Sequence, residues 1–323
     1  MDVSVIIPTY NRPESALRTL NSLRQQTLSP DRYEVILVDD GSTADTQIID
    51  DQDFPFAFHF LHKENGGATK ARNFGVQRSG GKVLVFIDDD ITISAEALAA
   101  LADACVQNEK VVAMGTLISC SNNEPGLFTQ DALALANEGV VGDGLAPEAY
   151  RHFSHCNTQL LAVRRDHFFD LGLLQDPTGG WPNWDDVDFG YRSHLAGFRL
   201  LQVGAAVGEH WDYAIRELTA ACRRWQKAGH SAVRLFQVHP GLQPHIPMFA
   251  DKTPITRHDS PRLIMRKLIR ILASTAVALR GMEALTNWLE KRRPSSRLLR
   301  PLYRWVQGGY MFRGYHEGLN DTA

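Results

Sequence analysis

The sequence predicts an α/β fold, a doubly wound, Rossmann-like mixed sheet that ends in a helical C-terminal appendage. In the first half of the chain, short apolar runs alternate with segments of helical periodicity, the pattern of βαβ units. A length of 323 residues with 44% hydrophobic content is enough to bury a large core. Residues 1–256 carry 21 Lys and Arg against 32 Asp and Glu, whereas residues 257–323 carry 13 against 5. The body is therefore acidic and the tail basic.

The apolar runs mark the expected strands, because β-branched and aromatic residues cluster in them between turn residues. Strands are expected at Val3–Pro8, Tyr33–Asp39, Phe56–His62, Lys82–Ile87, Val111–Leu117 and Phe198–Val203. Residues 118–155 are rich in Gly, Asn, Pro and Glu with weak periodicity, so we expect a long loop region there. Ordered structure is expected to resume at Cys156–Val163.

Helices are expected between the strands, where apolar residues recur at helical spacing. Pro13 can occupy the first turn of the first helix without losing a needed N–H. Ser94 is a candidate N-cap for a later one. The helical segments are Pro13–Leu23, Ala68–Phe74, Ser94–Cys105, Arg165–Leu171 and Val187–Ala196, the last closed by Gly197.

Cysteine usage and the apolar segments indicate a cellular location. The four cysteines lie far apart without a C-x-x-C pair, so neither a zinc site nor a disulfide framework is expected, and a reducing cytoplasm fits best. The N-terminal segment lacks the basic region of a signal peptide. No window reaches 18 uncharged apolar residues, so any membrane contact is expected to be peripheral, at the inner face of the plasma membrane.

Two groups of carboxylates follow predicted strands. Asp39 and Asp40 come after the second strand, and Asp88–Asp90 come directly after the fourth. In an open α/β sheet the carboxyl ends of the strands form the ligand crevice, so both groups should converge there. Neighbouring carboxylates repel each other, which favours a bound cation, and oxygen ligands suit Mg²⁺ or Mn²⁺. For Asp39 and Asp40 a solvated turn is the competing interpretation.

Five segments in a fixed order resemble the successive motifs of glycosyltransferase family 2, inverting enzymes of GT-A fold. The segments are VSVIIPTYNRPESALRTLNSLRQQT, YEVILVDDGSTADT, NGGATKARNFG, VLVFIDDD and GGWPNWDDVDFGYR, and together they span about residues 3–211. Each motif alone is weak, but the ordered set is specific.

The resemblance implies a nucleotide-sugar donor, with a UDP-sugar favoured. It places Pro8, Thr9 and Tyr10 beside the base, and Asp39 on a nucleobase edge. Asn65 and Arg72 would lie near the nucleotide, although a surface helix arginine is the plain alternative for Arg72.

The D-x-D pattern of the family maps onto the triplet after the fourth strand. It implies that Asp88 faces the ribose and that Asp90 holds Mn²⁺ or Mg²⁺ against the diphosphate, where the metal assists departure of the leaving group. Asp89 can substitute for either. His210, behind the late strand, would complete the metal site, with a structural histidine as the alternative.

A second acidic segment resembles the family's E-D-x-D motif. It implies Asp186 as the general base for an acceptor hydroxyl, with Asp185 and Asp188 in support. The helix dipole alone also favours acids in a first turn.

Three further residues are assigned to the sugars. Trp181 and Trp184 could stack on sugar rings, although tryptophan is more often a core residue. Asn157 would line the donor-sugar pocket, with a strand-edge asparagine as the alternative.

The expected organisation is a catalytic domain over residues 1–215, with a nucleotide-sugar half at about 1–117 and an acceptor half at about 118–215. Residues 216–323 form a basic helical extension. Within it, residues 262–313 interleave aliphatic side chains with Arg and Lys. This pattern favours peripheral membrane contact, a packed appendage or a homo-oligomer contact. No nucleic-acid motif is present, and a nucleic-acid partner is not expected.

The functional hypothesis is a metal-dependent inverting transferase that adds one sugar to a hydroxyl of a glycan or lipid-linked acceptor. Processive relatives carry Q-x-x-R-W, whereas this chain has Ala221-Cys222-Arg223-Arg224-Trp225, which favours single addition. The alternatives are a polyprenyl-phosphate sugar synthase and a non-catalytic nucleotide-sugar-binding subunit.

Overall fold

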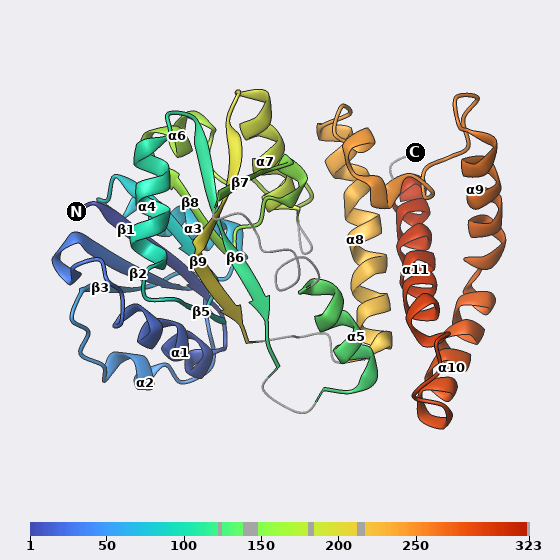
Figure 1. The fold of residues 1–323 in the computed structure, drawn as a ribbon, viewed down its shortest axis with the longest axis horizontal. Coiled ribbons are helices and arrows are strands. Elements are labelled where there is room, and N and C mark those ends of the chain that lie inside the picture. The colour runs from blue at the N-terminus through green and yellow to red at the C-terminus, as the bar shows by residue number, and fades with distance from the viewer. Residues whose placement is uncertain (122–124, 138–147, 180–183, 212–216, 322–323) are drawn as a thin grey trace. The chain divides into compact units, whose positions relative to one another are not determined.

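The computed structural model describes residues 1–121, 125–137, 148–179, 184–211 and 217–321. These residues form two compact units, a sheet unit and a helical unit (Figure 1). The sheet unit comprises residues 1–121, 136–137, 148–175 and 185–211. The helical unit comprises residues 125–135, 176–179, 184 and 217–321, so it includes segments that lie before the predicted start of the extension at residue 216.

The sheet unit is built on a nine-stranded mixed sheet, which confirms the predicted α/β class. The strand order is β3-β2-β1-β4-β8-β6-β9-β5, with β7 also paired to β9. The strands are β1 Val3–Thr9, β2 Tyr33–Asp39, β3 Ala57–His62, β4 Val83–Ile87, β5 Ile91–Ile93, β6 Val111–Ser119, β7 Glu148–Arg151, β8 Leu160–Arg164 and β9 Arg199–His210.

The four strands β3, β2, β1 and β4 run parallel to one another, and β8 runs antiparallel to β4. Thr9 pairs with Asp39, so β1 and β2 end level with each other. Parallel strands bring their carboxyl ends to one edge, and the segments after β1, β2 and β4 therefore meet at that edge.

Helices cover both faces of the sheet because successive side chains along each strand alternate between two cores. Val5 and Ile7 pack with helices α1 and α4, whereas Ile6 packs with α3, α6 and α7. The helices of this unit are α1 Pro13–Leu23, α2 Gln47–Asp50, α3 Ala68–Gln77, α4 Ala97–Gln107, α6 Arg165–Asp170 and α7 Asp185–Leu195. The sheet is doubly wound, as predicted.

Three local expectations were wrong or incomplete. The expected loop over residues 118–155 contains α5 Leu127–Ala136 and β7 at its end. The late strand runs to His210 instead of Val203, because β9 continues past a register shift and pairs with β5. Ser94 does not cap α4: its hydroxyl donates to the Ala205 carbonyl, and the Gln26 side chain accepts from the Leu98 N–H instead.

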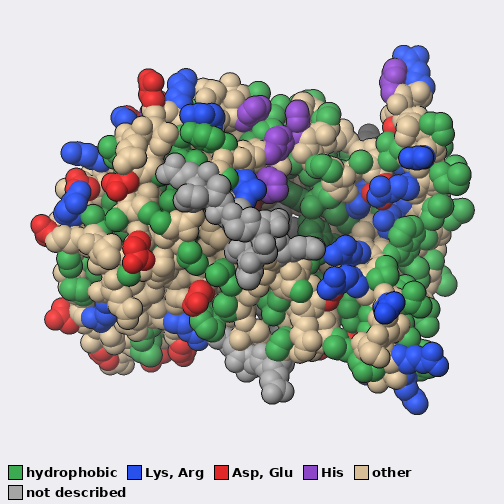
Figure 2. Space-filling view, in the orientation of Figure 1, with side chains coloured by type: hydrophobic (Ala, Val, Ile, Leu, Met, Phe, Trp, Pro, Cys, Tyr) green, Lys and Arg blue, Asp and Glu red, His purple; other side chains and the backbone are tan. Residues whose placement is uncertain are grey.

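The helical unit is formed mainly by α8 Leu218–Val238, α9 Pro261–Ala273, α10 Ala276–Arg292 and α11 Leu299–Asp321. Its core joins α5, α8 and α11 through Phe128, Cys222 and Tyr303. Across the ranges that the structure describes, none of the helices combines the length and apolar character needed to span a bilayer. Figure 2 shows hydrophobic side chains along the outer edge of α9 and α10, interspersed with Lys and Arg.

Candidate active site

The residues that follow β1 and β4 are joined by side-chain contacts. Thr9, the last residue of β1, donates through its hydroxyl to Asp89 at 2.7 Å. Arg12 reaches the same carboxylate at 3.0 Å. Burial raises the pKa of Asp89 to about 7, even though Arg12 and Thr9 act in the opposite direction. Asp89 is thus a buried carboxyl held by Thr9, at the end of β1, and by Arg12, which follows it.

Two of the predicted acidic segments, Asp88–Asp90 and Asp185–Asp188, meet at Arg72, which lies on α3 and is buried. Its guanidinium contacts Asp88 at 2.5 Å and Asp185 at 3.5 Å. Thr69, one turn earlier, donates to the same oxygen of Asp185 at 2.7 Å. The DDD segment after β4 and the DDVD segment at the start of α7 therefore lie within reach of one side chain.

Asp90 lies beside the predicted second metal ligand. Its Oδ2 is 3.3 Å from His210 Nε2 and 2.9 Å from Arg12. Burial would raise the pKa of Asp90, but His210 and Arg12 together hold it below its usual value. The pairing of Ile91 with His210 between β5 and β9 brings the two side chains together.

The donor set at Asp90 fits a divalent metal. Asp90 Oδ1 is buried and has no hydrogen-bond partner, which leaves a carboxylate oxygen available as a ligand. Among the described residues no three His, Cys, Asp or Glu side chains gather in a metal-binding group. One carboxylate and one imidazole suit an ion that takes its other ligands from substrate phosphates and water.

Asp186 has the environment of a general base. Its carboxylate accepts the N–H of Val187 at 2.7 Å, at the first turn of α7. Burial, followed by the charge of Asp185, raises the pKa of Asp186 to about 7. A carboxyl with a pKa near neutrality can accept a proton at working pH and still release it, which is what general-base catalysis requires.

The other two acids of that turn, Asp185 and Asp188, form hydrogen bonds with side chains of the sheet unit. Asp185 is held by Thr69 and Arg72, as described above. Asp188 is fully buried and accepts from Arg192 Nε at 2.7 Å, one turn later on α7. Both contacts fix the start of α7 and with it the backbone that carries Asp186.

Asp39 and Asp40 are buried and hold the segments that follow β2 and β3, so neither lies on a solvated turn. Asp39 accepts the Ser42 N–H at 3.0 Å and lies 3.1 Å from His62 Nδ1. Asp40 accepts the N–H groups of Gly66 and Gly67 and pairs with Lys63. The Asn65 amide donates to the Asp40 carbonyl at 2.9 Å, so the Asn65-Gly66-Gly67 segment is tied to the end of β2.

The remaining sequence-predicted residues are placed as follows. Pro8 is in β1, and Tyr10, just beyond it, is 46% exposed. Asn157 precedes β8, and its Oδ1 is buried without a hydrogen-bond partner, as a ligand-facing group would be. Trp181 lies outside the described residues.

Trp184 belongs to the helical unit and packs there. Its indole N–H donates to the Ala228 carbonyl at 3.2 Å and lies 3.1 Å from Ser231 Oγ. Its ring lies 5.9 Å from that of Phe249. These contacts favour the core alternative for Trp184 over a sugar platform.

Sequence reasoning missed two residues of the cluster, Arg12 and Thr69. Both could have been found from their positions, because Arg12 lies three residues beyond β1 and Thr69 lies in the first turn of α3. Each is therefore at the same edge of the sheet as the predicted carboxylates.

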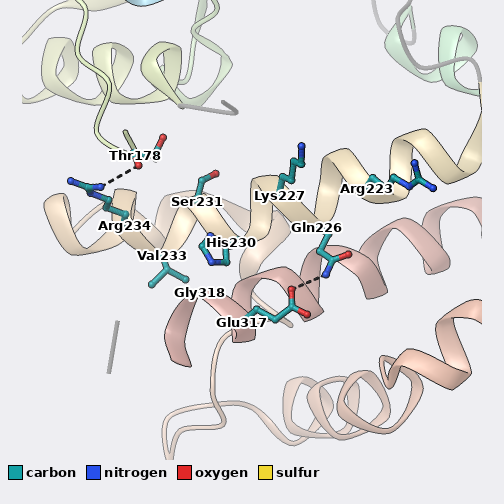
Figure 3. A pocket seen from close by; sticks show the side chains of 10 residues that line it. All are labelled: Thr178, Arg223, Gln226, Lys227, His230, Ser231, Val233, Arg234, Glu317 and Gly318. Atoms are coloured by element: carbon teal, nitrogen blue, oxygen red, sulfur yellow. Dashed lines mark hydrogen bonds between the residues drawn. The ribbon is translucent and has the colours of Figure 1, made fainter. Parts of the chain in front are cut away.

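The helical unit has a separate groove of about 680 Å³ along α8 and α11 (Figure 3). Glu317, the acidic residue that lines the groove, accepts hydrogen bonds from Gln226 at 2.7 Å and from Arg313. Arg223 and Lys227 line the groove, and neither forms an ion pair with another described residue. The uncompensated charge of the groove is positive, so it can accept an anionic group.

The chain was compared with known proteins. The sequence model of "Glycosyl transferase family 2" matches residues 4–168, about half of the chain. A validoxylamine A glucosyltransferase of Streptomyces hygroscopicus subsp. limoneus is 35% identical over 277 residues, covering 76% of this chain and 58% of the relative. The matches cover 63% and 62% of two further bacterial glycosyltransferases, so the chain spans less than two thirds of these relatives.

Two solved structures share the fold. The mannosyltransferase PcManGT from Pyrobaculum calidifontis, in complex with GDP-Man and Mn²⁺, superposes with a TM-score of 0.61 at 18% identity, over 99% of this chain and 88% of that one. TarS 1-349 of S. aureus, in complex with UDP-GlcNAc, gives 0.55 at 18% identity, over 100% and 92%.

Proposed function

The chain belongs to glycosyltransferase family 2 and has the GT-A fold, and we propose that it transfers a single sugar from a nucleotide-sugar donor to an acceptor hydroxyl with inversion. One observation carries this proposal. Arg72 contacts both Asp88, which follows β4, and Asp185, which precedes Asp186 at the start of α7. This contact supports the proposal, because it would hold a donor-binding carboxylate and a general base at one edge of the sheet.

The chain's own residues supply the proton transfer. The acceptor oxygen forms a bond to the anomeric carbon while the bond from that carbon to the diphosphate oxygen breaks. The acceptor proton passes to Asp186, whose pKa of about 7 suits this role. Attack from the side opposite the leaving nucleoside diphosphate inverts the anomeric configuration.

The donor site combines residues at the ends of the four parallel strands β1–β4 with Asn157, before β8, and His210, at the end of β9. Pro8, Thr9, Tyr10, Asp39 and Asn65 would contact the nucleotide, Asp88 and Asp89 the ribose side, and Asn157 the donor sugar. Asp90 and His210 would hold Mn²⁺ or Mg²⁺, which when bound neutralises charge on the leaving diphosphate. The neighbour complexes contain UDP-GlcNAc in one case and GDP-Man with Mn²⁺ in the other. We favour a UDP-sugar as the donor here.

The acceptor and location are part of the same proposal. We assign a glycan or lipid-linked acceptor, a place in polysaccharide or cell-envelope biosynthesis, and a cytoplasmic location at the inner face of the plasma membrane. The four cysteines are all free, as a reducing compartment would keep them. Residues 262–313 are the proposed membrane contact, with a homo-oligomer contact as the alternative.

The decisive experiment replaces Asp186 by Asn. We expect transfer from UDP-sugars in the presence of Mn²⁺ to fall by about 10²- to 10⁴-fold. Donor affinity should stay within about twofold of the wild type, since Asp186 makes no proposed donor contact. The control is Asp166→Asn, an exposed carboxylate on α6 that pairs with Arg164. Unchanged turnover in Asp186→Asn would favour a polyprenyl-phosphate sugar synthase, because an anionic phosphate acceptor needs no base.

A wild-type protein that binds a UDP-sugar but never releases UDP, with or without acceptor extracts, would favour the non-catalytic binding subunit. Because donor binding is measured separately from turnover, the two alternatives give different results.

A further inference from the structure

Helix α9 buries cationic side chains and exposes aliphatic ones, the reverse of what an amphipathic helix at a water-facing surface does. Its buried side chains are Lys267 and Arg270. On the other side Met265, Leu268 and Leu272 are exposed to 63%, 49% and 75%. Residues at positions i, i+3 and i+7 share one helical face, so this is a continuous aliphatic stripe. In water, a helix normally buries that stripe and exposes its cations.

Buried hydrogen bonds fix this orientation. Lys267 donates to Asp259 at 2.7 Å and to the Pro254 carbonyl at 2.9 Å. Arg270 donates to the Trp305 carbonyl at 3.0 Å and contacts Asp251 at 3.3 Å. Rotating α9 to bury its aliphatic stripe would break both sets, and each buried cation is costly to leave unpaired. The aliphatic face is therefore held outward.

Helix α10 continues the apolar face. Val277, Leu285 and Trp288 are exposed to 83%, 52% and 54%, and their spacing places them on one side of the helix. Nine of the twenty large hydrophobic side chains that are exposed in the described residues fall within residues 261–300. A patch of this density on a chain surface indicates an interaction site rather than scattered exposure.

The exposed charges around this face have a single sign. Residues 261–300 contain eight exposed charged side chains, all of them cationic: Arg262, Arg266, Arg280, Lys291, Arg292, Arg293, Arg297 and Arg300. Of these, Arg266 pairs with Asp251 and Arg300 with Asp131. The two acids of the segment are half-buried and turned toward other helices. Glu283 accepts from Tyr310 at 2.6 Å, and Glu290 accepts the Phe128 N–H at 3.4 Å.

We propose that the exposed face of α9 and α10 lies on an anionic phospholipid bilayer, with its aliphatic side chains at the headgroup boundary and its cations on the phosphates. Aliphatic area combined with Arg and Lys is the chemistry that binds such a surface. A second copy of the chain fits less well, because a two-fold contact through this face would bring the exposed cations of α9 and α10 in both copies close together. The inference rests on the membrane contact proposed above and narrows it to α9 and α10; the transferase reaction is tested separately.

The test measures partition of the full chain onto vesicles by flotation. The vesicles contain phosphatidylcholine alone, or phosphatidylcholine with about one third phosphatidylglycerol. The variant Leu268→Ser/Leu272→Ser removes two exposed side chains of the stripe. The matched control, Val106→Ser/Leu195→Ser, removes two side chains of the sheet unit that are 69% and 66% exposed.

We expect the wild type and the control to bind anionic vesicles, and the stripe variant to bind at least about tenfold more weakly. The variant Arg262→Gln/Arg280→Gln/Arg292→Gln should lose anionic binding similarly, and about 0.5 M salt should weaken wild-type binding. Equal binding by the stripe variant and the wild type overturns the proposal, as does a wild type that binds no vesicles. A lipid-free wild-type dimer that the stripe substitutions convert to monomer would assign the face to a second copy. Donor hydrolysis, measured in parallel, tests the proposed reaction separately.

Discussion

At the scale of single residues, the site depends on how its carboxylates are neutralised. Asp88 and Asp185 share Arg72, and Asp89 and Asp90 share Arg12. Asp186 contacts no cation directly in the hydrogen bonds or ion pairs of the described chain, and its pKa rises to about 7. Asp186, the proposed base, and Asp89 thus share a pKa near 7, but only Asp89 is in direct contact with a cation.

This environment predicts a pH-dependent stability difference for Asp186→Asn. The folded-state pKa, about 7, lies well above the ordinary value of an aspartate carboxyl, so the ionised form destabilises the fold. Wild-type stability should therefore fall as the pH rises from about 4 to above 7, by an amount on the order of a few kcal/mol. Asp186→Asn removes that loss, so its Tm should exceed that of the wild type at pH 8 and match it near pH 4.

The control for this prediction is a carboxylate with the opposite shift. Arg164 lowers the pKa of Asp166 to about 2, and the pair is exposed. Asp166→Asn should leave the Tm unchanged or slightly lower at pH 8. A Tm difference for Asp186→Asn that does not vary with pH would contradict the assigned environment. The same titration predicts that turnover falls below about pH 7, as the base becomes protonated.

Arg12 predicts how the site responds to a metal. In the metal-free chain its guanidinium contacts Asp90 Oδ2 at 2.9 Å, so it competes with a cation for that oxygen. Arg12→Ala should therefore bind Mn²⁺ about 3- to 10-fold more tightly and gain more thermal stability from added MnCl₂ than the wild type does. Arg32→Ala, which removes an exposed ion pair with Asp2, should respond to MnCl₂ as the wild type does. Identical Mn²⁺ affinities for Arg12→Ala and the wild type would rule out this competition.

The sequence could identify the acids of the site but not their partners. The positions of Asp88–Asp90 and Asp185–Asp188 follow from motif order and strand ends, which are local properties. Which carboxylate pairs with Arg12 or Arg72 depends on side-chain directions set by tertiary packing. The same limit applies to Trp184, whose residue type suits both a sugar platform and a core position, and whose contacts are with α8.

At the scale of elements, long periodic segments were predictable and short or interrupted ones were not. The bounds expected for β1 and β2 agree with the structure to within a residue, and the helical spacing after Pro13 falls within α1. β5 has three residues, too few for a detectable alternation. The predicted strand corresponding to β9 was too short, because Gly204, Ala205 and Ala206 interrupt its apolar run. In the structure the strand continues through these residues with a shift of register.

The orientation of α9 was also beyond sequence reasoning. Its periodicity shows an aliphatic face and a cationic flank, but not which of the two is buried. Asp251 and Asp259, from the segment before α9, decide this by pairing with Arg270 and Lys267.

The packing of α8 against α11 predicts the effect of glycine substitutions. A Cβ at Gly314 would lie 1.8 Å from the Gln226 carbonyl oxygen, so the two helices are in contact at this glycine. Gly314→Ala should destabilise the helical unit by about 1–3 kcal/mol, because the backbones must move apart. Urea denaturation followed by circular dichroism would measure it.

Gly281→Ala is the matched control on α10. A Cβ at Gly281 meets nothing within 4 Å, so the same substitution there should stabilise by up to about 1 kcal/mol through helix propensity. Equal effects at the two positions would show that α8 and α11 do not approach closely at Gly314.

At the scale of the whole molecule, the two units carry different chemistry. The carboxylate cluster belongs to the sheet unit, whereas the cationic groove and the apolar face of α9 and α10 belong to the helical unit. The charge of the sequence changes sign at about residue 257, whereas the helical unit already includes α8, so composition indicated a distinct basic region but not the bounds of this unit. The inclusion of α5 in the helical unit could not be anticipated, because its contacts are with residues far along the chain.

This division predicts two separate footprints in hydrogen–deuterium exchange. UDP with MnCl₂ should slow exchange at residues 88–91, because this segment carries proposed donor and metal ligands and a bound ligand suppresses local opening. Vesicles containing phosphatidylglycerol should instead slow exchange in α9 and α10. The Arg262→Gln/Arg280→Gln/Arg292→Gln variant should lose the vesicle footprint and keep the nucleotide footprint, while Asp90→Asn should do the reverse. If UDP and MnCl₂ protected α9 and α10 but left residues 88–91 unchanged, the donor site would lie in the helical unit, and the assignment of the carboxylate cluster to donor binding would be wrong.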